Sequence, residues 1–278
     1  MVAVSFCIVL FYNWRDAMTI GILGFGTLGS MIAQRLINTG INPMDISVVE
    51  RPSNRTRISA LGVRGVAAHD LNAVDVLILT TKPNQFERAW KAMGSEVSPT
   101  TVVLSFMAKT PLENIIAVTQ SKHVVRAMTS TPCVLGLGIG AWIAAPTIGS
   151  LERERAQSII ATLGSHIEAE IEDEIAIATV LSSINGMLYV LVHAMEQALN
   201  DIGASKRYQK LVVPLIESAL AFTKHRGDTH LIALADEVTS PNGTTAALRH
   251  VLARAGITAV ITEAVRAAYE KAKEAPRK

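Results

Sequence analysis

A glycine-rich turn separates an apolar run from an amphipathic run in the segment MTIGILGFGTLGSMIAQRL, and it constrains the fold more than any other feature. Gly24, Gly26 and Gly29 have the spacing G-x-G-x-x-G. Between a strand and a helix, the first glycine permits a tight turn, the second lets a pyrophosphate approach the backbone, and the third lets the helix pack on the strand. The run DISVVE follows as a second strand, so the context predicts a dinucleotide-binding βαβ unit. The residues predicted to contact the dinucleotide here are Gly24, Phe25, Gly26, Thr27 and Leu28.

The end of the second predicted strand indicates which dinucleotide fits. Glu50 stands at about the distance at which a carboxylate binds the ribose 2′-hydroxyl of NAD. Arg51, Ser53, Asn54 and Arg55 follow at once, and two guanidinium groups with small polar groups suit a 2′-phosphate. Glu50 then points away from the ribose or pairs with one of the arginines. The segment favours NADPH over NADH as the cofactor. The alternative without a ligand role is that the arginines form a solvated loop.

Three more apolar runs alternate with helical runs, in VDVLILTTKP, TVVLSFMAKTPL and HVVRAMTSTP. Strands that alternate with helices predict a parallel, doubly wound sheet, and ligands bind beyond the carboxyl ends of its strands. Thr81, Lys82, Ala108 and the segment 129–132 fall at such ends. Thr81, Lys82 and Ala108 are therefore predicted cofactor contacts. After a further helix, a short strand is predicted over 166–170.

The chain beyond about residue 172 is patterned for helices. We predict helices over about 174–200, 205–225 and 228–235, and two between about 244 and 275. The uncharged run IAIATVLSSINGMLYVLV is predicted to be buried against other helices, including those of a second subunit, because polar residues interrupt its middle. The fold prediction is α/β: an N-terminal Rossmann-type doubly wound parallel sheet followed by an all-helical C-terminal dimerisation domain.

The predicted domains are an N-terminal extension at 1–17, a dinucleotide-binding domain at 18–172 and a helical dimerisation and substrate domain at 173–278. The apolar run AVSFCIVLFY in the extension is about half as long as a membrane helix and lacks a basic flank. We expect the extension to have no role in the fold.

Composition argues against several classes of protein. The net charge of +2 gives no basic surface for nucleic acid. The two cysteines, Cys7 and Cys133, lie far apart, which indicates neither a metal motif nor a disulfide framework and favours a reducing cytoplasm. A hydrophobic fraction of 49% with 18% charged residues suggests an oligomer interface. We therefore expect a cytoplasmic homo-oligomer without metal, nucleic acid or membrane partners.

A second motif lies near the C-terminus, in DEVTSPNGTTAALRHVL. A Ser-Pro-Asn-Gly turn precedes two threonines and an apolar-periodic run, which is a strong signal for the start of a helix. Such a start can aim free backbone N–H groups and two hydroxyls at an anion. The alternative is an ordinary capped helix.

Four segments in this order resemble the pyrroline-5-carboxylate reductase family, which carries out the NADPH-dependent last step of proline synthesis. They are GILGFGTLGSMIAQRL, DVLILTTKP, VVRAMTSTPCVLGLGIG and, most specifically, DEVTSPNGTTAALRHVL followed by ITEAVRAAYEKAKE. The last motif is similar to the family signature Val-Thr-Ser-Pro-Gly-Gly-Thr-Thr, and the resemblance spans Met18 to about Lys273.

The resemblance implies a Rossmann domain, a helical domain that interlocks with a second subunit, and an active site at that interface. It also implies that the turn before the helix holds the substrate carboxylate with backbone N–H groups. Thr245 corresponds to the family threonine whose hydroxyl reaches the imine nitrogen, and it is the predicted catalytic residue. The implied substrate-binding residues are Ser240, Asn242, Gly243, Thr244 and Thr245.

Four positions depart from the family pattern. The run INGMLY, Ile184 to Tyr189, stands where the family has Gly-Ser-Gly-Pro-Ala-Tyr, and MTSTP stands for Met-Pro-Asn-Thr-Pro. Asn242 and Lys109 each replace a glycine. Met187 and Leu188 are bulkier than Pro and Ala, so the substrate pocket is expected to be smaller or differently shaped. Asn242 is compatible with the turn because Asn adopts left-handed backbone more readily than most residues.

Three functions remain open. The leading one is NADPH-dependent reduction of a cyclic imine carboxylate, with pyrroline-5-carboxylate as the expected substrate and proline as the product. A β-hydroxyacid dehydrogenase is weaker, because its interdomain-helix lysine is absent: no lysine occurs between Lys122 and Lys206. The third is a paralogue that keeps the fold and the dinucleotide site but acts on another imine or keto acid, or in regulation.

Overall fold

The computed structural model describes residues 18–94 and 96–274, so the predicted extension 1–17 and Cys7 lie outside the described residues. The chain forms two compact units. The first unit runs to Ser182 and includes the chain again from Tyr269, and the second unit is Ser183–Ala268. The predicted domain boundary at residue 172 remains a prediction.

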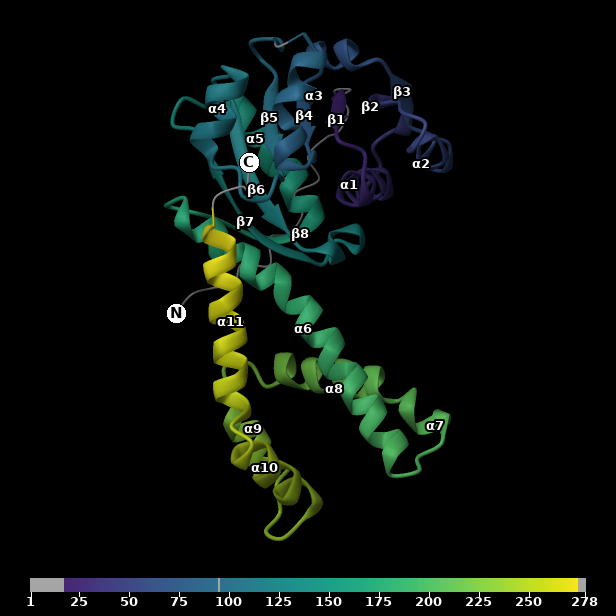
Figure 1. Cartoon of the computed structure of the whole chain (residues 1–278), viewed down its shortest axis with the longest axis vertical. Helices are drawn as coiled ribbons and strands as arrows, with labels where there is room; N and C mark the ends of the chain where they lie inside the picture. Colours follow the sequence, from purple (N-terminus) through teal and green to yellow (C-terminus); the bar gives the residue numbers. More distant parts are fainter. Residues whose placement is uncertain (1–17, 95, 275–278) are drawn as a thin grey trace. The chain divides into compact units, whose positions relative to one another are not determined.

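The first unit is built on one eight-stranded sheet with the order β3-β2-β1-β4-β5-β6-β7-β8 (Figure 1). All neighbouring strands are parallel except β6 and β7. The strands are β1 (Ile20–Leu23), β2 (Ile46–Val49), β3 (Arg64–Val66), β4 (Val76–Leu79), β5 (Val102–Ser105), β6 (Val124–Thr129), β7 (Gly138–Ala144) and β8 (Gly164–Glu168). The doubly wound fold class is thus confirmed.

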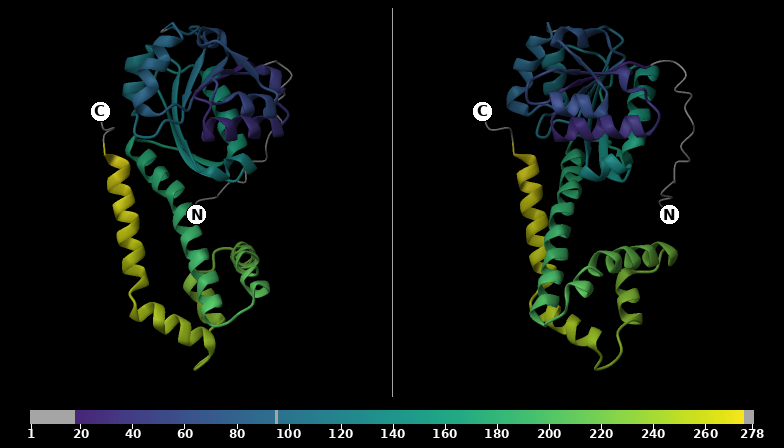
Figure 2. Two further views of the ribbon diagram at one scale, coloured as in Figure 1. Left: turned by 45° about the vertical axis from the view of Figure 1, so that its right-hand side comes forward. Right: turned by 90° about the vertical axis from the view of Figure 1, so that its right-hand side faces the viewer.

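Helices cover both faces of this sheet, which Figure 2 shows between its helical layers. They are α1 (Thr27–Asn38), α2 (Arg55–Leu61), α3 (Phe86–Ala92), α4 (Leu112–Thr119) and α5 (Ser150–Leu163), with four 3₁₀ turns at η1 (Pro43–Asp45), η2 (Ala68–Ala73), η3 (Pro83–Gln85) and η4 (Thr131–Leu135). Helices α1 and α5 bury Ile32, Leu36 and Ile159 against one face, and α3 and α4 bury Trp90 and Ile115 against the other. Since both faces are covered, the central strands are uninterrupted apolar runs.

Strands β3 and β7 were not predicted from the sequence. Strand β7 (GIGAWIA) carries two glycines that weaken a strand signal. Position 138 has no room for a side chain, because a Cβ on Gly138 would lie 2.6 Å from the carbonyl oxygen of Leu163. The same strand runs antiparallel to β6, which the prediction of a wholly parallel sheet did not include.

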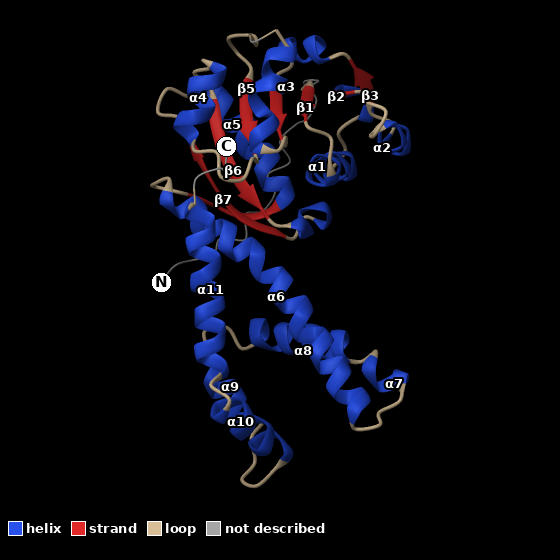
Figure 3. Ribbon diagram, in the orientation of Figure 1, coloured by secondary structure: helices blue, strands red, loops and turns tan. Residues whose placement is uncertain are grey.

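The described part of the second unit contains helices and loops (Figure 3). Helix α6 (Asp173–Asp201) leads into it and α11 (Ile257–Lys273) leads out; between them are α7 (Lys206–Gln209), α8 (Val212–His225), α9 (Leu231–Glu237) and α10 (Thr244–Arg254). The predicted helical regions match these elements, except that the region predicted over 205–225 is divided into α7 and α8.

Helix α6 is not covered within a single chain. It is long and apolar enough to cross a membrane by length and composition alone, a weak criterion that core helices of soluble proteins also meet. Only 17% of the most apolar 18-residue stretch of α6 is buried. Leu181, Leu188, Tyr189 and Val190 are exposed. The sequence prediction that other helices, including those of a second subunit, bury α6 stays a prediction.

We predict that Gly29→Ala lowers the free energy of unfolding by about 1–3 kcal/mol, the usual cost of overpacking. A Cβ on Gly29 would lie 2.5 Å from the carbonyl oxygen of Gly24, and neither backbone segment can move freely at the turn. Urea unfolding of the two proteins checks this. Gly26→Ala, in the same turn, is the matched control: its φ is −87° and a Cβ there meets nothing within 4 Å, so its free energy of unfolding should stay within about 1 kcal/mol of wild type. A Gly29→Ala midpoint equal to that of wild type would contradict the packing role.

Candidate active site

The glycine turn between β1 and α1 is shaped to receive an anion. Gly24 has a φ of 105°, and a Cβ there would lie 2.5 Å from the backbone nitrogen of Thr81. Gly26 is the N-cap residue of α1, and a Cβ there would meet nothing within 4 Å. Among the residues that the structure describes, no side chain caps α1, and its first turn has no acidic residue. The first N–H groups of α1 therefore face open space, as a pyrophosphate requires.

The other predicted residues of this turn differ in exposure. Thr27 is exposed, as Gly26 is, and Leu28 is half-buried. The Phe25 side chain is buried in the core, so its contribution to a bound phosphate is limited to its backbone. Thr80 holds the turn in place, since its hydroxyl donates to the carbonyl of Gly24.

The loop after β2 resolves the alternatives for Glu50. Arg55 Nε donates to Glu50 Oε1 at 2.8 Å, so Glu50 pairs with an arginine. The Glu50 carboxylate also lies over β3, because a Cβ on Gly65 would be 2.8 Å from its Oε2. Arg51 and Ser53 are exposed.

Asn54 has a structural role in the same loop. Its side chain is buried, accepts from the backbone N–H of Arg51 at 2.8 Å and donates to the carbonyl of Val49 at 2.8 Å. These two bonds fix the path of the chain between β2 and α2. The Asn54 amide therefore positions the two arginines, and its contact with a cofactor remains a prediction.

The residues predicted after β4 and β5 lie close to one another. Thr81 Oγ1 is 3.2 Å from the Met107 sulfur, and Thr110 Oγ1 donates to the Ala108 carbonyl at 3.2 Å. Lys82 is the N-cap residue of η3. With Thr81 packed under Gly24, these residues share one edge of the sheet with the glycine turn.

The backbone conformation at Lys109, which replaces a family glycine, shows why the family has glycine there. Its φ is 55°, in the left-handed region where glycine is normally required. The family glycine at this position is therefore explained by the backbone, and a lysine here is conformationally costly. Its ammonium lies 3.7 Å from Glu274 Oε2.

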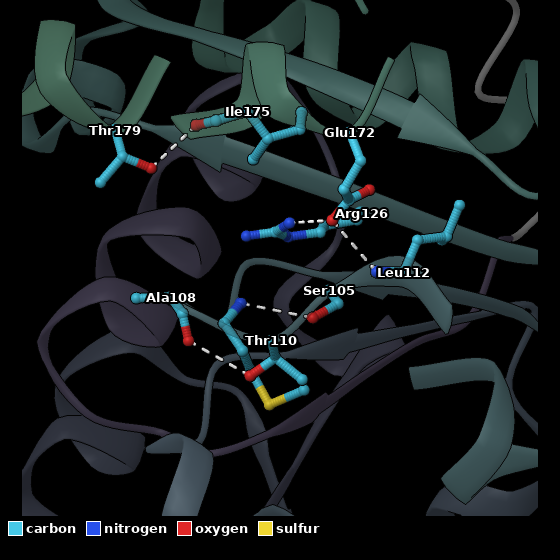
Figure 4. A network of polar contacts seen from close by, with 9 residues as sticks. Ser105, Ala108, Thr110, Leu112, Arg126, Glu172, Ile175 and Thr179 are labelled. Atoms are coloured by element: carbon cyan, nitrogen blue, oxygen red, sulfur yellow. Dashed lines mark hydrogen bonds and ion pairs between the residues drawn. The ribbon is translucent and has the colours of Figure 1, made fainter. Parts of the chain in front are cut away.

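A polar network beside these residues was not found from the sequence (Figure 4). Arg126 on β6 pairs with Glu172, and Glu172 also accepts from the backbone N–H of Leu112 at 3.2 Å. Glu172 belongs to the acidic run EIEDE, whose composition is typical of a solvated linker between domains, but its contacts show that this interpretation is wrong for Glu172. A lone glutamate in an acidic run has no local signal that reveals a partner 46 residues away.

Two other titratable groups lie near the end of β6: His166 of β8 and Cys133 of η4. His166 Nε2 is 3.0 Å from Thr129 Oγ1, in the MTSTP segment, and burial lowers the pKa of His166. Burial also raises the pKa of the Cys133 thiol to about 11, so this cysteine is protonated at neutral pH and is a poor nucleophile.

The C-terminal motif begins α10 in the second unit. Gly243 is the N-cap residue, no side chain caps the helix, and the first turn, with Thr244 and Thr245, carries no acidic group. Asn242 has a φ of 59°, as expected for the residue that replaces a glycine in the turn. The Gly243 N–H donates to the Ser240 carbonyl at 3.0 Å, which closes the turn. This start of a helix can therefore accept an anion.

The exposure of the motif suits contact with a small ligand. Gly243 and Thr245 are half-buried, while Ser240, Asn242 and Thr244 are exposed. A Cβ on Gly243 would press against the Ser240 hydroxyl and lie 3.1 Å from the Ser240 carbonyl oxygen, so a larger residue at this N-cap would require the Ser240 side chain to move.

Comparisons with known proteins agree with this arrangement. Residues 172–275 match the family model described as pyrroline-5-carboxylate reductase dimerisation, and residues 19–109 match the model described as NADP oxidoreductase coenzyme F420-dependent. Pyrroline-5-carboxylate reductase from Synechocystis sp. is 27% identical over 94% of this chain and 100% of its own length. Pyrroline-5-carboxylate reductase 1 from Bacillus subtilis is 25% identical over 93% and 90%.

A solved structure has the same fold. The crystal structure of Plasmodium falciparum pyrroline carboxylate reductase with NADP bound superposes with a TM-score of 0.82 at 21% identity, covering 92% of this chain and 97% of that chain. The resemblance inferred from the sequence motifs is thus confirmed over both units. The chain is thus a divergent relative of the pyrroline-5-carboxylate reductases, and its residues 172–275 match their dimerisation domain.

Proposed function

We propose that the chain is an NADPH-dependent reductase of a cyclic imine carboxylate, with pyrroline-5-carboxylate as substrate and proline as product. The observation that carries this proposal is the pair of uncapped helix starts, one at Gly26 and one at Gly243. The first suits a dinucleotide pyrophosphate and the second suits a substrate carboxylate. The names of the relatives support an oxidoreductase that acts on a CH–NH group with NAD(P)H.

The proposed cofactor contacts lie on the first unit. The backbone around Gly24 to Leu28 would hold the pyrophosphate, and Arg51, Ser53 and Arg55 would hold the 2′-phosphate, with Asn54 fixing their loop. Thr81, Lys82 and Ala108 would lie along the rest of the dinucleotide. NADP in the related Plasmodium structure and the description of the family model for 19–109 support NADPH.

The proposed substrate contacts lie on the second unit. Backbone N–H groups at the start of α10 would bind the carboxylate, helped by a helix dipole equivalent to about half a positive charge. The Thr245 hydroxyl would hydrogen-bond the imine nitrogen, which polarises the C=N bond as the nitrogen becomes an amine. NADPH supplies the hydride to the imine carbon. The protein contributes orientation and this hydrogen bond, so the chemistry needs no additional acid–base pair.

A second candidate is a related reaction on another imine or keto acid, or a binding role without catalysis. The segment Ile184–Tyr189 motivates it, since Met187 and Leu188 stand where the family has Pro and Ala. A pocket changed in this way would prefer a ring of different size. Turnover of the six-membered piperideine carboxylate in place of the five-membered pyrroline carboxylate distinguishes this candidate from the leading one.

The same proposal includes a homodimer, or a larger oligomer of dimers, in the cytoplasm. The match of 172–275 to a dimerisation model supports self-association. Exposed apolar side chains on three helices of the second unit, α6, α8 and α10, support it as well: Leu188, Tyr189, Val190, Leu215, Phe222, Leu248 and Val251. A second copy would cover these groups, so neither a membrane nor nucleic acid is needed as a partner.

Arg51→Ala together with Arg55→Ala should raise the Michaelis constant for NADPH about tenfold or more and leave that for NADH within about twofold. The physical reason is the loss of two charge-assisted hydrogen bonds to a phosphate that NADH lacks. Steady-state kinetics with each cofactor measure the two constants. Arg57→Ala, an exposed arginine on the same helix, is the matched control. An equal loss for both cofactors would contradict the 2′-phosphate assignment.

The reaction itself is tested with NADPH that carries deuterium at the transferred position. The proposal predicts proline with one deuterium on the ring carbon next to nitrogen, detected by mass spectrometry. Formation of no proline, while NADPH binding persists in a fluorescence titration, would reject pyrroline-5-carboxylate as the substrate and favour the second candidate.

A further inference from the structure

An ion pair between a buried arginine and a half-buried glutamate lies beside the predicted nicotinamide end of the site. Arg126 is 7% exposed, and its Nη1 donates to Oε1 of Glu172, which directly precedes α6 (Figure 4). Among the described residues, Arg126 Nε and Glu172 Oε2 have no hydrogen-bond partner although both atoms are buried. Buried charges with unsatisfied atoms contribute little or negatively to stability, so their presence needs an explanation other than stability.

The Glu172 side chain also caps the N-terminus of α4. Its Oε1 accepts from the backbone N–H of Leu112, the first residue of α4. The first N–H groups of a helix lack intrahelical partners, and the N-cap residue Pro111 has no side-chain acceptor to offer. The carboxylate therefore replaces the missing cap and fixes where α4 begins.

The start of α4 is the far end of the loop 106–111. The near end of this loop is fixed by Phe106 N–H donating to the Leu79 carbonyl at 2.9 Å and by Met107 N–H donating to Ser105 Oγ at 3.3 Å. Within the loop, Thr110 Oγ1 bonds back to the Ala108 carbonyl. The position of Ala108 thus depends on both anchors, and Glu172 provides the far one.

The strand order places this loop on the nicotinamide half of a Rossmann sheet. In the order 3-2-1-4-5-6, one half of the sheet binds each mononucleotide of a dinucleotide. The arginine loop follows β2 in the first half, and loop 106–111 follows β5 in the second. The adenine end of NADPH therefore belongs with β1–β3, and the nicotinamide end belongs with β4–β6.

We infer that Arg126 and Glu172 are positioning residues that hold loop 106–111 in place for the nicotinamide half of the cofactor. This inference rests on the proposed NADPH binding. Glu172 acts through the Leu112 N–H, and Arg126 acts by holding the Glu172 carboxylate in one orientation. Neither residue needs to touch the cofactor.

Docking of α6 does not depend on this pair. Ile175 and Ala178, in the first turns of α6, are buried against Met128 and Ala141 of the sheet. This apolar cluster keeps the base of the helix attached when the Glu172 carboxylate is removed. Variants at Glu172 are thus expected to fold.

The test compares two ligands on the full-length protein, NADPH and adenosine 2′,5′-bisphosphate, which has the adenine end alone. Glu172→Ala should weaken NADPH binding about tenfold, which is the usual effect of losing one hydrogen bond to a charged group. Its affinity for the bisphosphate should stay within about twofold of wild type. Glu172→Gln keeps an oxygen acceptor for the Leu112 N–H, so it should stay within about threefold for both ligands. Glu168→Ala is the control, since it removes a more exposed ion pair, between Glu168 of β8 and Arg153 of α5, away from loop 106–111.

Hydrogen exchange of the cofactor-free protein provides a second readout. The Leu112 amide should exchange faster in Glu172→Ala than in wild type, and Glu172→Gln should restore its protection. Equal weakening of both ligands in Glu172→Ala, or no weakening of either, would overturn the inference.

The outcomes also separate this inference from the proposed function. If the wild-type protein does not bind NADPH, both the proposed cofactor and this inference are rejected. A wild-type protein that binds NADPH but does not reduce pyrroline-5-carboxylate would reject the substrate and leave the inference standing on the binding data.

Discussion

Thr245→Ala is expected to lower kcat by about 10²–10³-fold while the affinity for NADPH stays near that of wild type. Loss of one donor aimed at a group whose charge changes in the transition state usually has an effect of this size. Thr245 lies in the first turn of α10, in the second unit, whereas the proposed NADPH contacts belong to the first unit. Alanine is also a better helix former than threonine, so the fold should be retained. Steady-state kinetics and a fluorescence titration of NADPH measure the two quantities.

Two neighbouring variants control this result. Thr245→Ser keeps the hydroxyl and should recover most of the activity. Thr244→Ala keeps the backbone N–H groups at the start of α10 and removes an exposed hydroxyl, so its effect should be small. Activity of Thr245→Ala within about threefold of wild type would remove Thr245 from the proposed chemistry.

Gly26→Asp is expected to weaken NADPH binding at least about 100-fold and to leave the protein as stable as wild type or slightly more so. Its φ of −87° suits any residue, and a Cβ there has open space. Aspartate is a preferred N-cap residue, so it would bind the free N–H groups of α1 itself and stabilise the helix. The same carboxylate would occupy and repel the site of a pyrophosphate. Thermal unfolding and NADPH titration measure the two effects on one sample.

The separation of stability from binding is the informative part of this experiment. Gly26→Ser caps the helix without charge and should weaken NADPH less than the aspartate does. Wild-type NADPH affinity in Gly26→Asp would show that the pyrophosphate does not bind at the start of α1.

The central sheet and the helices could be predicted because their signals are local. Val76–Leu79 is buried on both faces and reads as a continuous apolar run, and the start of α10 is marked by its own turn residues. The pairing of Glu50 with an arginine was also accessible, because Arg55 lies five residues away on the same loop. These features need no knowledge of distant parts of the chain.

The features that were missed depend on distant parts of the chain. Strand β7 contains glycines at 138 and 140 whose purpose is close packing against neighbouring segments, so they resemble loop residues in the sequence. Arg126 and Glu172 become partners through the register of β6 and the place where α6 begins, neither of which has a local sequence signal. The apolar side chains of α6 that are exposed in the single chain show the same limit, because no local pattern in the sequence says what would cover them.

The most direct measurement is NADPH oxidation by the purified wild-type protein with pyrroline-5-carboxylate, followed at the nicotinamide absorbance band. The account predicts turnover that saturates with both ligands and yields one proline for each NADPH oxidised. The absence of turnover from a folded protein that still binds NADPH would contradict it, and would show that the changes around Met187 and Leu188 have altered the ligand of the pocket.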